Sequence, residues 1–482
     1  MNLKPYPEYK DSGVAWLGEV PKHWEIHPNR ALFYERNRKN NPEMELLSVT
    51  ITKGVIYQKE LISNTSKKDS SNEDKSKYKL VKQGDIAYNK MRMWQGAVGA
   101  SKYEGIVSPA YIIVHHRDGM DEWFYHYLFR SPKYIKESHR YSYGICDDQL
   151  SLRIDDFKRI FTPKPQLEEQ RHIVKFLDYK TAQITRFIKA KKRMIELLKE
   201  QKQVIINDAV TGKIVIKDEG GRLKAEKRPD SSFIPYPSSF LQTVPEGWET
   251  RKITTVCALI IDGTHFSPKS DITGDYLYIT AKNIKETGLD LKNVTYIKSA
   301  DHREIYNRCP VSRSDVLYIK DGATAGIATV NPLIEEFSLL SSVALIRTKS
   351  AILAPEYLAL QFNSLKFKMH VLNNLVGGAM TRFTLEIIKR FQLLIPPILE
   401  QQQIVSYIET KTAALDQAIS RTEREIALMQ EYRTRLISDV VTGKIDVQNI
   451  EIPDIANIDD TIDESIDEPE GEEELETEEA EE

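Results

Sequence analysis

The chain has 482 residues, 41% of them apolar, which is enough for two or three packed domains. No apolar run approaches the roughly 20 residues of a membrane span, and the first ten residues lack an apolar signal core, so we expect a cytoplasmic protein that does not enter a membrane. Cys146, Cys257 and Cys309 have no paired spacing, which argues against a disulfide framework or a cysteine zinc site.

The net charge of −4 hides a division of the chain into a basic body and an acidic tail. No Lys or Arg follows Lys444, and 18 of the 71 Asp and Glu residues lie between Asp446 and Glu482. Without that tail the body has 67 basic against 53 acidic residues, a balance typical of proteins that bind polyanions. We expect the tail to be disordered and to act as a solubilising segment, or else to compete with nucleic acid for the body.

A gap-free internal duplication dominates the sequence. Residues 165–174 (PQLEEQRHIV) open a long helical stretch that ends at residues 210–214 (VTGKI). Residues 396–405 (PPILEQQQIV) and 441–445 (VTGKI) repeat both ends after the same offset of 231 residues. Two copies in one chain predict approximate two-fold symmetry, which suits a target that also has two halves.

The duplication also covers the regions before the two helices. Residues 20–25 (VPKHWE) recur at 244–249 (VPEGWE), and 84–88 (GDIAY) resemble 314–318 (SDVLY). Because Trp24 and Trp248 occupy the same place in each copy, we expect them to anchor the cores. The predicted organisation is a globular domain at 1–165, a spacer helix at 166–213, a linker at 214–240, a second globular domain at 241–397, a second spacer helix at 398–446 and an acidic tail at 447–482.

Both globular regions mix strand-like and helical patterns. Residues 111–114, 276–279 and 342–346 are short apolar runs typical of strands, whereas 123–128 and 356–367 have helical spacing. The expected class is α+β, with two globular α/β domains in a pseudo-two-fold arrangement, separated by two long antiparallel helices.

The two helical stretches share one coiled-coil seam with steps of four and three residues. A stretch of about 45 residues would be roughly 65 Å long. Gly212 and Gly443 follow the last seam positions and can adopt the left-handed conformation that ends a helix. The predicted packing residues are Leu177, Ile184, Ile188, Ile195, Leu198 and Ile205 in the first helix, and Ile408, Leu415, Ile419, Ile426, Met429 and Leu436 in the second.

We expect the two helices to pair within the chain and hold two binding domains apart. The alternative is a general dimerisation element. The basic run at 189–193 has no counterpart in the second helix, so we interpret it as a solvated face rather than a phosphate contact.

A search for catalytic machinery finds little. Thr211, Gly212 and Lys213 resemble the end of a phosphate-binding loop, but Asn207 stands where its first glycine belongs. The sequence has no paired-histidine metal motif, Gly-rich nucleotide fingerprint, amino-methyltransferase signature or convincing nuclease core. We therefore expect a non-catalytic recognition protein without a metal or cofactor of its own.

These motifs resemble a known family. Residues 9–24 (YKDSGVAWLGEVPKHW), the Pro-x-Leu-Glu-Glu-Gln helix start and the Thr-Gly-Lys-Ile helix ends are similar to those of specificity subunits of type I restriction–modification systems. Residues 262–268 (DGTHFSP) are similar to a loop of the target-recognition domains in that family. The resemblance spans residues 1 to about 446, although the first domain lacks a clear Asp-Gly-Thr-His loop and the second has a shorter leading segment.

The resemblance implies a division of labour among subunits. Each globular domain would be a target-recognition domain that reads one half of a bipartite, asymmetric site in double-stranded DNA. The helices would set the spacing and dock two methyltransferase subunits, which carry S-adenosylmethionine and flip out an adenine for N6-methylation. A separate restriction and motor subunit would use ATP and Mg²⁺ to translocate and to cleave unmodified DNA.

The candidate DNA-contacting residues lie in loops after strands or around glycines. Arg suits guanine, Asn and Gln suit adenine, and Lys suits phosphate. The candidates are Lys90, Arg92, Gln95, Arg140, Tyr141, Tyr143 and Gln149 in the first domain, and His265, Lys269, Lys282, Asn283, Lys320, Thr324 and Arg382 in the second.

Two other interpretations stay open from the residues alone. One is a stand-alone DNA-modifying or DNA-cleaving enzyme with an unrecognised site, which would act as a purified chain. The other is a coiled-coil scaffold, which sequence-specific, salt-sensitive DNA binding would exclude.

Overall fold

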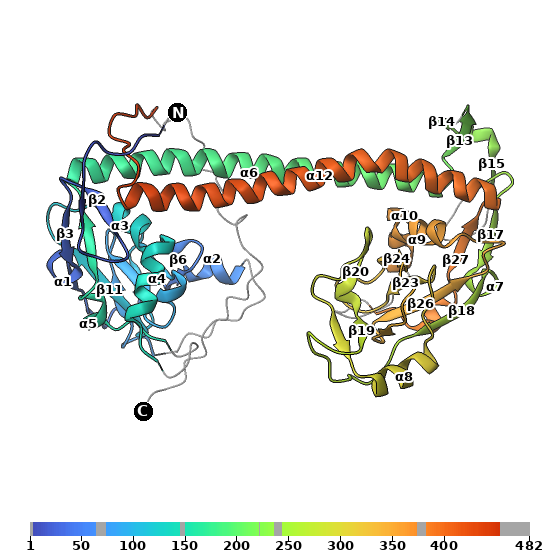
Figure 1. Cartoon of the computed structure of the whole chain (residues 1–482), viewed down its shortest axis with the longest axis horizontal. Coiled ribbons are helices and arrows are strands. Elements are labelled where there is room, and N and C mark those ends of the chain that lie inside the picture. Colours follow the sequence, from blue (N-terminus) through green and yellow to red (C-terminus); the bar gives the residue numbers. More distant parts are fainter. Residues whose placement is uncertain are drawn as a thin grey trace. The chain divides into compact units, whose positions relative to one another are not determined.

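The chain forms two compact units in the computed structural model, which describes residues 3–63, 74–144, 150–220, 222–235, 243–373 and 382–453. Unit 1 comprises Met1–Arg193 and Glu423–Glu482, and unit 2 comprises Met194–Thr422. The two longest helices, α6 (Leu167–Val210) and α12 (Ile398–Val441), therefore each contribute one end to each unit (Figure 1).

Unit 1 is built on a four-stranded antiparallel sheet. Its order is β4 (Phe33–Glu35), β11 (Tyr111–His116), β8 (Ile86–Asn89) and β9 (Val98–Ala100). Successive side chains of a strand point to opposite faces, and both faces of this sheet are covered. Ile86 and Tyr88 belong to the larger core of unit 1, on the face covered by the helices described below. Ala87 belongs to a smaller core on the other face, formed with β5 (Leu47–Thr50), β6 (Gly54–Tyr57) and their neighbours.

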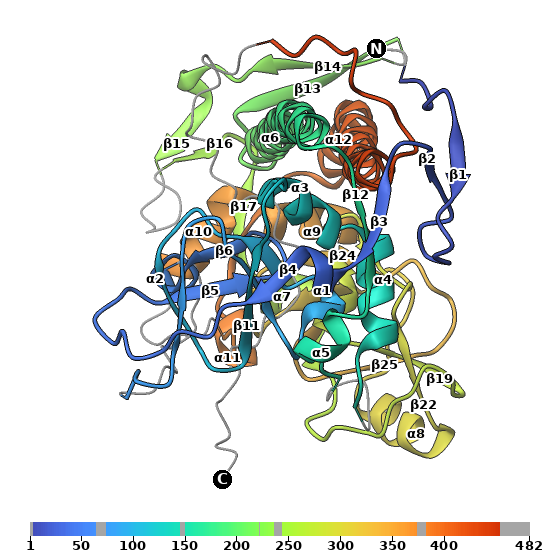
Figure 2. The same ribbon diagram turned by 90° about the vertical axis from the view of Figure 1, so that its left-hand side faces the viewer.

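Two helices close the larger core of unit 1 (Figure 2). The carboxylate of Asp121 caps α3 (Glu122–Phe129) by accepting from the backbone N–H groups of Trp123 and Phe124, and Ser131 caps α4 (Pro132–Tyr141). Trp24 lies in this core and is fully buried, which confirms it as a core anchor.

Unit 2 repeats this arrangement. Its four-stranded sheet has the order β18 (Cys257–Asp262), β26 (Val343–Thr348), β23 (Val316–Ile319) and β24 (Ala328–Val330), with α9 (Pro355–Asn363) and α10 (Leu365–Asn373) against one face. The strands alternate in the same way, because Val316 and Tyr318 join one core and Leu317 and Ile319 the other. The duplication seen in the sequence is therefore also a duplication of topology.

The remaining elements complete the two units. In unit 1 they are β1 (Tyr9–Asp11), β2 (Glu19–Pro21), β3 (Glu25–Pro28), α1 (Asn29–Leu32), α2 (Gln58–Ser63), β7 (Lys79–Val81), η1 (Met93–Gln95), β10 (Gly105–Val107), α5 (Ile154–Phe157) and β12 (Phe161–Lys164). In unit 2 they are β13 (Ile214–Glu219), β14 (Arg222–Lys227), η3 (Asp230–Ser232), β15 (Phe233–Pro235), β16 (Thr243–Pro245), β17 (Glu249–Lys252), α7 (Ile253–Val256), β19 (Tyr276–Ile279), η4 (Ala281–Asn283), β20 (Ile284–Lys285), β21 (Gly288–Leu289), β22 (Thr295–Ile297), α8 (Ser299–Arg308), β25 (Ser338–Leu339), α11 (Leu385–Ile388) and β27 (Gln392–Ile395).

The two long helices pack on each other in opposite directions. In unit 1 the start of α6, with Phe176 and Leu177, shares a core with the end of α12, with Leu436 and Val440. In unit 2 the end of α6 shares a core with the start of α12. The predicted α+β class with two long antiparallel helices is confirmed.

The predicted seam residues are all shielded from solvent to some degree. Lys191 and Lys202, which interrupt the apolar seam of α6, form ion pairs with Glu425 at 2.7 Å and Asp416 at 2.6 Å on α12. The two lysines of the seam are thus each matched by an opposite charge on the other helix. Buried are Leu177, Ile184, Ile188, Ile408, Ile426 and Leu436, and half-buried are Ile195, Leu198, Ile205, Leu415, Ile419 and Met429.

The repeated helix starts bind the repeated tryptophans. Trp24 Nε1 donates to Glu169 Oε1 at 2.9 Å, and Trp248 Nε1 donates to Glu400 Oε2 at 3.0 Å. In the next position, Gln170 donates to the backbone carbonyl of Pro165 at 2.7 Å, and its equivalent Gln401 repeats this bond at 2.8 Å. The Glu-Gln pair shared by the two repeats, Glu169–Gln170 and Glu400–Gln401, therefore fastens each helix to its domain.

The repeated helix ends pack against the repeated Val-Pro segments, α12 in unit 1 and α6 in unit 2. Gly443 ends α12 with φ +75°, and a Cβ there would lie 2.3 Å from Pro21 Cδ in unit 1. Gly212 ends α6 with φ +70°, and a Cβ there would lie 2.3 Å from Pro245 Cγ in unit 2. Only glycine combines this backbone conformation with such close approach.

The stretch predicted as a linker contains a hairpin. β13 and β14 pair antiparallel from Ile214↔Lys227 to Glu219↔Arg222, and Ile216 is buried in the core of unit 2. The composition of this stretch indicated a linker, but the alternation of Ile214 and Ile216 with polar residues favours a strand. None of the helices in the described ranges is long and apolar enough to cross a membrane.

Candidate nucleic-acid interface

Strand direction brings two loops of each unit to the same edge of its sheet. β4 and β8 both run antiparallel to β11, which lies between them, so both strands end at one edge. β18 and β23 have the same relation to β26. We call the loops that follow these strands the loop edge: residues 36–40 and 90–97 in unit 1, and residues 263–270 and 320–326 in unit 2.

In unit 2, one buried carboxylate organises the loop edge. Asp262, which ends β18 and is 3% exposed, accepts a hydrogen bond from Arg308 Nη2 at 3.0 Å. Its other oxygen lies 3.1 Å from Lys320 Nζ, and His265 Nε2 lies 3.3 Å from Oδ1. Asp262 therefore joins cationic or potentially cationic groups from three segments of the chain.

The Asp-Gly-Thr-His motif has a physical reason at each position. A Cβ on Gly263 would lie 2.0 Å from the carbonyl oxygen of Leu339, so no larger residue fits. Thr264 donates its backbone N–H to that same oxygen at 2.8 Å, and its hydroxyl accepts from the N–H of Phe266 at 3.2 Å. The loop is thereby fixed, and His265 is exposed on it.

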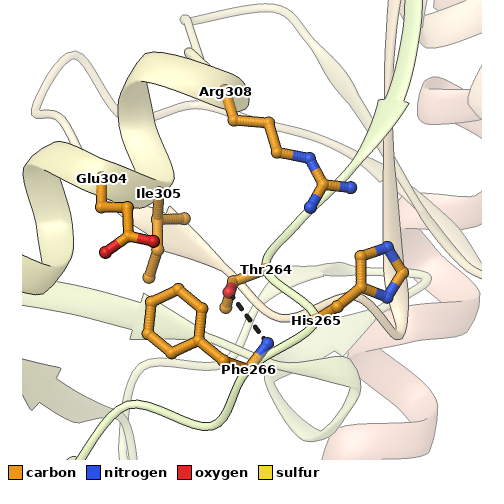
Figure 3. Close-up of a pocket in the computed structure, with 6 residues that line it drawn as sticks. All are labelled: Thr264, His265, Phe266, Glu304, Ile305 and Arg308. Carbon is orange, nitrogen blue, oxygen red and sulfur yellow. Dashed lines mark hydrogen bonds between the residues drawn. The ribbon is translucent and has the colours of Figure 1, made fainter.

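A pocket of about 460 Å³ opens beside this loop. Figure 3 shows Arg308, Glu304 and Ile305 on helix α8 facing the loop that carries Phe266. The pocket thus combines a guanidinium, a carboxylate, an imidazole and an aromatic ring. It is lined by Thr264, His265, Phe266, Glu304, Ile305 and Arg308.

The second loop of unit 2 is tied to the first and to a more distant segment. Lys320 is 3% exposed, and its backbone carbonyl accepts from the N–H of Phe383 at 2.7 Å. Arg382 Nε lies 3.3 Å from Asp321 Oδ1, so Arg382 reaches the same edge. Thr324 is exposed there.

Two of the predicted residues of unit 2 are engaged in holding the fold. Lys320 is buried beside Asp262 and Asp321. Asn283 is buried, accepts from the N–H of Thr280 at 3.0 Å and donates to the carbonyl of Asp290 at 3.1 Å. Lys269 and Lys282 are exposed.

In unit 1, the loop edge carries a group of basic side chains. Lys79 of β7 donates its Nζ to the carbonyl of Tyr111 at 2.8 Å, and the neighbouring Leu80 donates its N–H to the carbonyl of Arg38 at 2.7 Å. Burial lowers the pKa of Lys79, and the positive charges of Lys39 and Lys90 lower it further, against the opposing effect of Glu35. We call Arg38, Lys39, Lys79 and Lys90 the basic cluster.

Of the four residues in the basic cluster, only Lys90 was predicted from the sequence. The missed signal is the run RNRKNN at residues 36–41, which follows β4 as the Asp-Gly-Thr-His loop follows β18. Beside Lys90, Arg92 is half-buried and Gln95 is exposed in the turn that follows β8. These residues therefore share one edge.

The predicted residues around Gly144 lie next to that turn. α4 contacts η1 through Ser138, whose hydroxyl donates to the carbonyl of Met93 at 3.4 Å. Arg140 forms two hydrogen bonds with Glu137, at 2.9 and 2.6 Å, and stacks over Tyr141 at 5.2 Å. Tyr143 is 73% exposed, and Gln149 lies outside the described residues.

The described part of the chain offers no alternative site of metal chemistry. It holds no group of three or more His, Cys, Asp or Glu residues that could bind a metal ion. Cys257 and Cys309 are buried, and burial raises the pKa of each thiol to about 12, so both behave as apolar core residues. Cys146 lies outside the described residues.

Comparison with known proteins agrees with the motifs. Residues 245–426 match the family model of the type I restriction modification DNA specificity domain. The chain is 22% identical over 341 residues to the EcoBI specificity subunit of Escherichia coli, covering 69% of this chain and 68% of that one. It is 21% identical over 313 residues to the EcoKI specificity subunit of Escherichia coli strain K12, covering 63% and 62%.

The fold also has a solved counterpart. A chain in a structure that describes complex assembly and conformational transition of the type I R-M system aligns with a TM-score of 0.59, at 15% identity. The alignment covers 88% of this chain and 98% of the other. The family model and the two sequence matches confirm the resemblance to type I specificity subunits, and the structural alignment shows that the fold is shared.

Proposed function

We propose that this chain, whose residues 245–426 carry a type I restriction modification DNA specificity domain, directs a type I restriction–modification complex to its DNA site. Units 1 and 2 each read one half of a bipartite, asymmetric sequence in double-stranded DNA. The chain itself is non-catalytic.

The observation that carries this proposal is the repetition of the loop edge on two units whose side chains differ there. Equivalent strands, β4 and β8 in one unit and β18 and β23 in the other, end in polar loops at one edge. Unit 1 offers the basic cluster, whereas unit 2 offers the network around Asp262. Two units with the same strand arrangement but different side chains at the loop edge suit the two different halves of an asymmetric site.

The paired helices act in this proposal as the spacer between the two readers. A helix of 44 residues extends about 66 Å at 1.5 Å per residue. The shared seam, with its matched pairs Lys191–Glu425 and Lys202–Asp416, favours one fixed register. The surfaces of the pair dock two methyltransferase subunits.

The chemistry belongs to the partners. The methyltransferase subunits bind S-adenosylmethionine and take an adenine out of the duplex for N6-methylation. The restriction and motor subunit uses ATP and Mg²⁺ to cleave unmodified DNA. All of these steps occur in the cytoplasm. This chain determines the DNA sequence at which they take place.

We propose that the exposed or half-buried candidate residues face DNA, together with the other members of the basic cluster. Lys320 and Asn283 are excluded from this set because their side chains are buried and engaged within unit 2. The set comprises Lys90, Arg92, Gln95, Arg140, Tyr141, Tyr143, His265, Lys269, Lys282, Thr324 and Arg382, together with Arg38, Lys39 and Lys79.

The decisive experiment is methylome sequencing of the host with and without this gene. We expect one split, adenine-methylated motif to disappear when the gene is deleted. An unchanged methylome in a host that expresses the gene would contradict the proposal. Methylation or cleavage by the purified chain alone would favour a stand-alone enzyme instead.

A further inference from the structure

We propose that Arg308 reads the major-groove edge of a guanine in the half-site of unit 2, and that Asp262 is the positioning residue that holds its guanidinium in place. The inference rests on the proposed function and assigns a base-reading residue to the pocket shown in Figure 3.

The first support is the way in which Arg308 is held. It is the last residue of α8, and its Nη2 donates to Asp262 Oδ1 at 3.0 Å. The Asp262 side chain is 4% exposed, whereas that of Arg308 is 53% exposed. A guanidinium has five N–H donors, so an anchored Arg308 keeps donors for the O6 and N7 acceptors of guanine.

The second support is the charge around the pocket. Glu304 lines it one helical turn before Arg308, whereas the Asp262 carboxylate that anchors Arg308 is not among the lining residues. The Glu304 carboxylate disfavours a phosphate, whereas it can accept from the amino group of cytosine, the partner of guanine. The pocket therefore suits the edge of a base pair better than the DNA backbone.

The third support is the contrast with another arginine of the same unit. Arg347 forms hydrogen bonds to both oxygens of Asp315 at 2.7 Å. Its Nη2 also donates to the carbonyl of Pro310 at 2.7 Å and to Ser312 Oγ at 2.9 Å. Arg347 is thus committed to the fold, whereas Arg308 has one charge-bearing anchor and an exposed side chain beside a pocket.

The fourth support is the shape that residues 263–266 give to one side of the pocket. Gly263 permits the close approach to Leu339 that sets the loop, and the turn at Thr264 presents His265 and Phe266 beside Arg308. A planar base edge can enter between α8 and this loop, where Arg308 is already oriented.

The test uses the full chain co-expressed with its methyltransferase subunits and a pool of random-sequence double-stranded DNA. Bound DNA is selected and sequenced, and we expect a motif with two separated blocks for the unaltered chain. Arg308→Ala should lose the preference for one guanine in one block by about 10- to 100-fold and leave the other block unchanged.

Three further variants sharpen the test. Arg308→Lys keeps the charge but not the paired donors, so it should also lose that guanine. Asp262→Asn should weaken the preference at the same position. Arg303→Ala, which removes an exposed arginine of α8 that does not line the pocket, should leave the motif intact.

The possible failures are distinguishable. A random selection that yields no motif with the unaltered complex would refute the proposed function itself. A clear motif that Arg308→Ala and Arg308→Lys both preserve would refute the assignment of Arg308. An equal loss of affinity on all sequences would make Arg308 a phosphate contact and would also overturn the inference. If Arg308→Ala does not fold, Arg308→Lys decides.

Discussion

Glu169, at the start of α6, accepts a hydrogen bond at 2.9 Å from the indole of Trp24, although 145 residues separate the two along the chain. The same carboxylate accepts from the hydroxyl of Tyr6 at 2.8 Å and lies 2.9 Å from His23 Nε2. One buried side chain thus fastens the N-terminal segment of unit 1 to the long helix.

Glu169→Ala should destabilise unit 1 by about 2–4 kcal/mol, because it leaves the buried donors of Trp24 and Tyr6 without an acceptor. The matched control is Glu168→Ala. Its carboxylate is 86% exposed and lies 3.1 Å from the exposed Arg171, so we expect a change below about 0.5 kcal/mol. Chemical denaturation of both variants measures the difference, and equal stabilities would contradict the role of Glu169.

Gly443→Ala should also destabilise unit 1, by about 2–4 kcal/mol. The new Cβ would meet Pro21 at 2.3 Å and Trp24 at 3.1 Å in a backbone conformation that alanine disfavours. Gly119→Ala is the control, because Gly119 has φ +78° with nothing within 4 Å of a Cβ, and it isolates the backbone cost of about 1 kcal/mol. Thermal unfolding compares them, and similar losses would show that the contact with Pro21 is unimportant.

Lys39→Ala should weaken DNA binding to a similar degree on all sequences and reduce the slope of log affinity against log salt by about 1. The reason is that the proposed interface places the basic cluster against phosphate, which every sequence offers. Lys59→Ala serves as the control, because Lys59 is exposed, is paired with Glu45 and is not one of the loop-edge residues. A salt slope that stays the same for Lys39→Ala would remove the basic cluster from the interface.

Arg92→Ala should relax base preference in one half-site, at a cost of about 1–3 kcal/mol if Arg92 reads a guanine. Arg92 is half-buried in the turn after β8, beside the exposed Gln95. Selection from random DNA by the complete complex is the measurement. An equal loss on all sequences would assign Arg92 to phosphate instead.

The pH dependence of unit 1 should carry a contribution from His116 and Glu122, which lie 3.4 Å apart. The hydrogen bond to Glu122 raises the pKa of His116 above 6.5, and the same bond lowers the pKa of Glu122 below 4.5. The contribution of His116 to the free energy of unfolding is therefore complete below the ordinary histidine pKa, and it is lost as pH rises through the raised pKa of His116. The glutamate contribution is present above the ordinary glutamate pKa and is lost in acid.

His116→Gln should accordingly lose more stability at about pH 5.5 than at about pH 8, relative to the unaltered chain. Denaturant titrations at the two pH values measure this. A difference between the two proteins that does not vary with pH would show that the pair contributes no linked stability.

Local pattern was sufficient for much of the fold. The heptad spacing predicted the two long helices and their shared seam, and the repeated glycines predicted where those helices end. The hairpin of β13 and β14 was missed because Gly220 and the prolines that follow it were weighted above the alternation of Ile214 and Ile216.

Only part of the candidate site could be predicted from the sequence. Lys90 and Arg92 were identified because they follow a strand pattern within a few residues, and His265 because it belongs to the Asp-Gly-Thr-His loop. Lys320 and Asn283 follow strands too, but tertiary packing buries both of them. Arg38 and Lys39 lie in the basic run that follows β4, a signal that was overlooked. Lys79 and Arg308 have no such signal, since they become neighbours of the loop edge only through strand pairing and the packing of α8.

The sequence by itself determined the duplication, the paired helices and the resemblance to a DNA-specificity protein, because repeats, heptads and short motifs are recorded in the order of residues. Only the tertiary structure decided which side chains share an edge and which are buried there. Asp262 meets Arg308 and Lys320 across 46 and 58 positions of the chain because separate elements converge on the end of β18, and such convergence has no local periodicity from which it could be inferred.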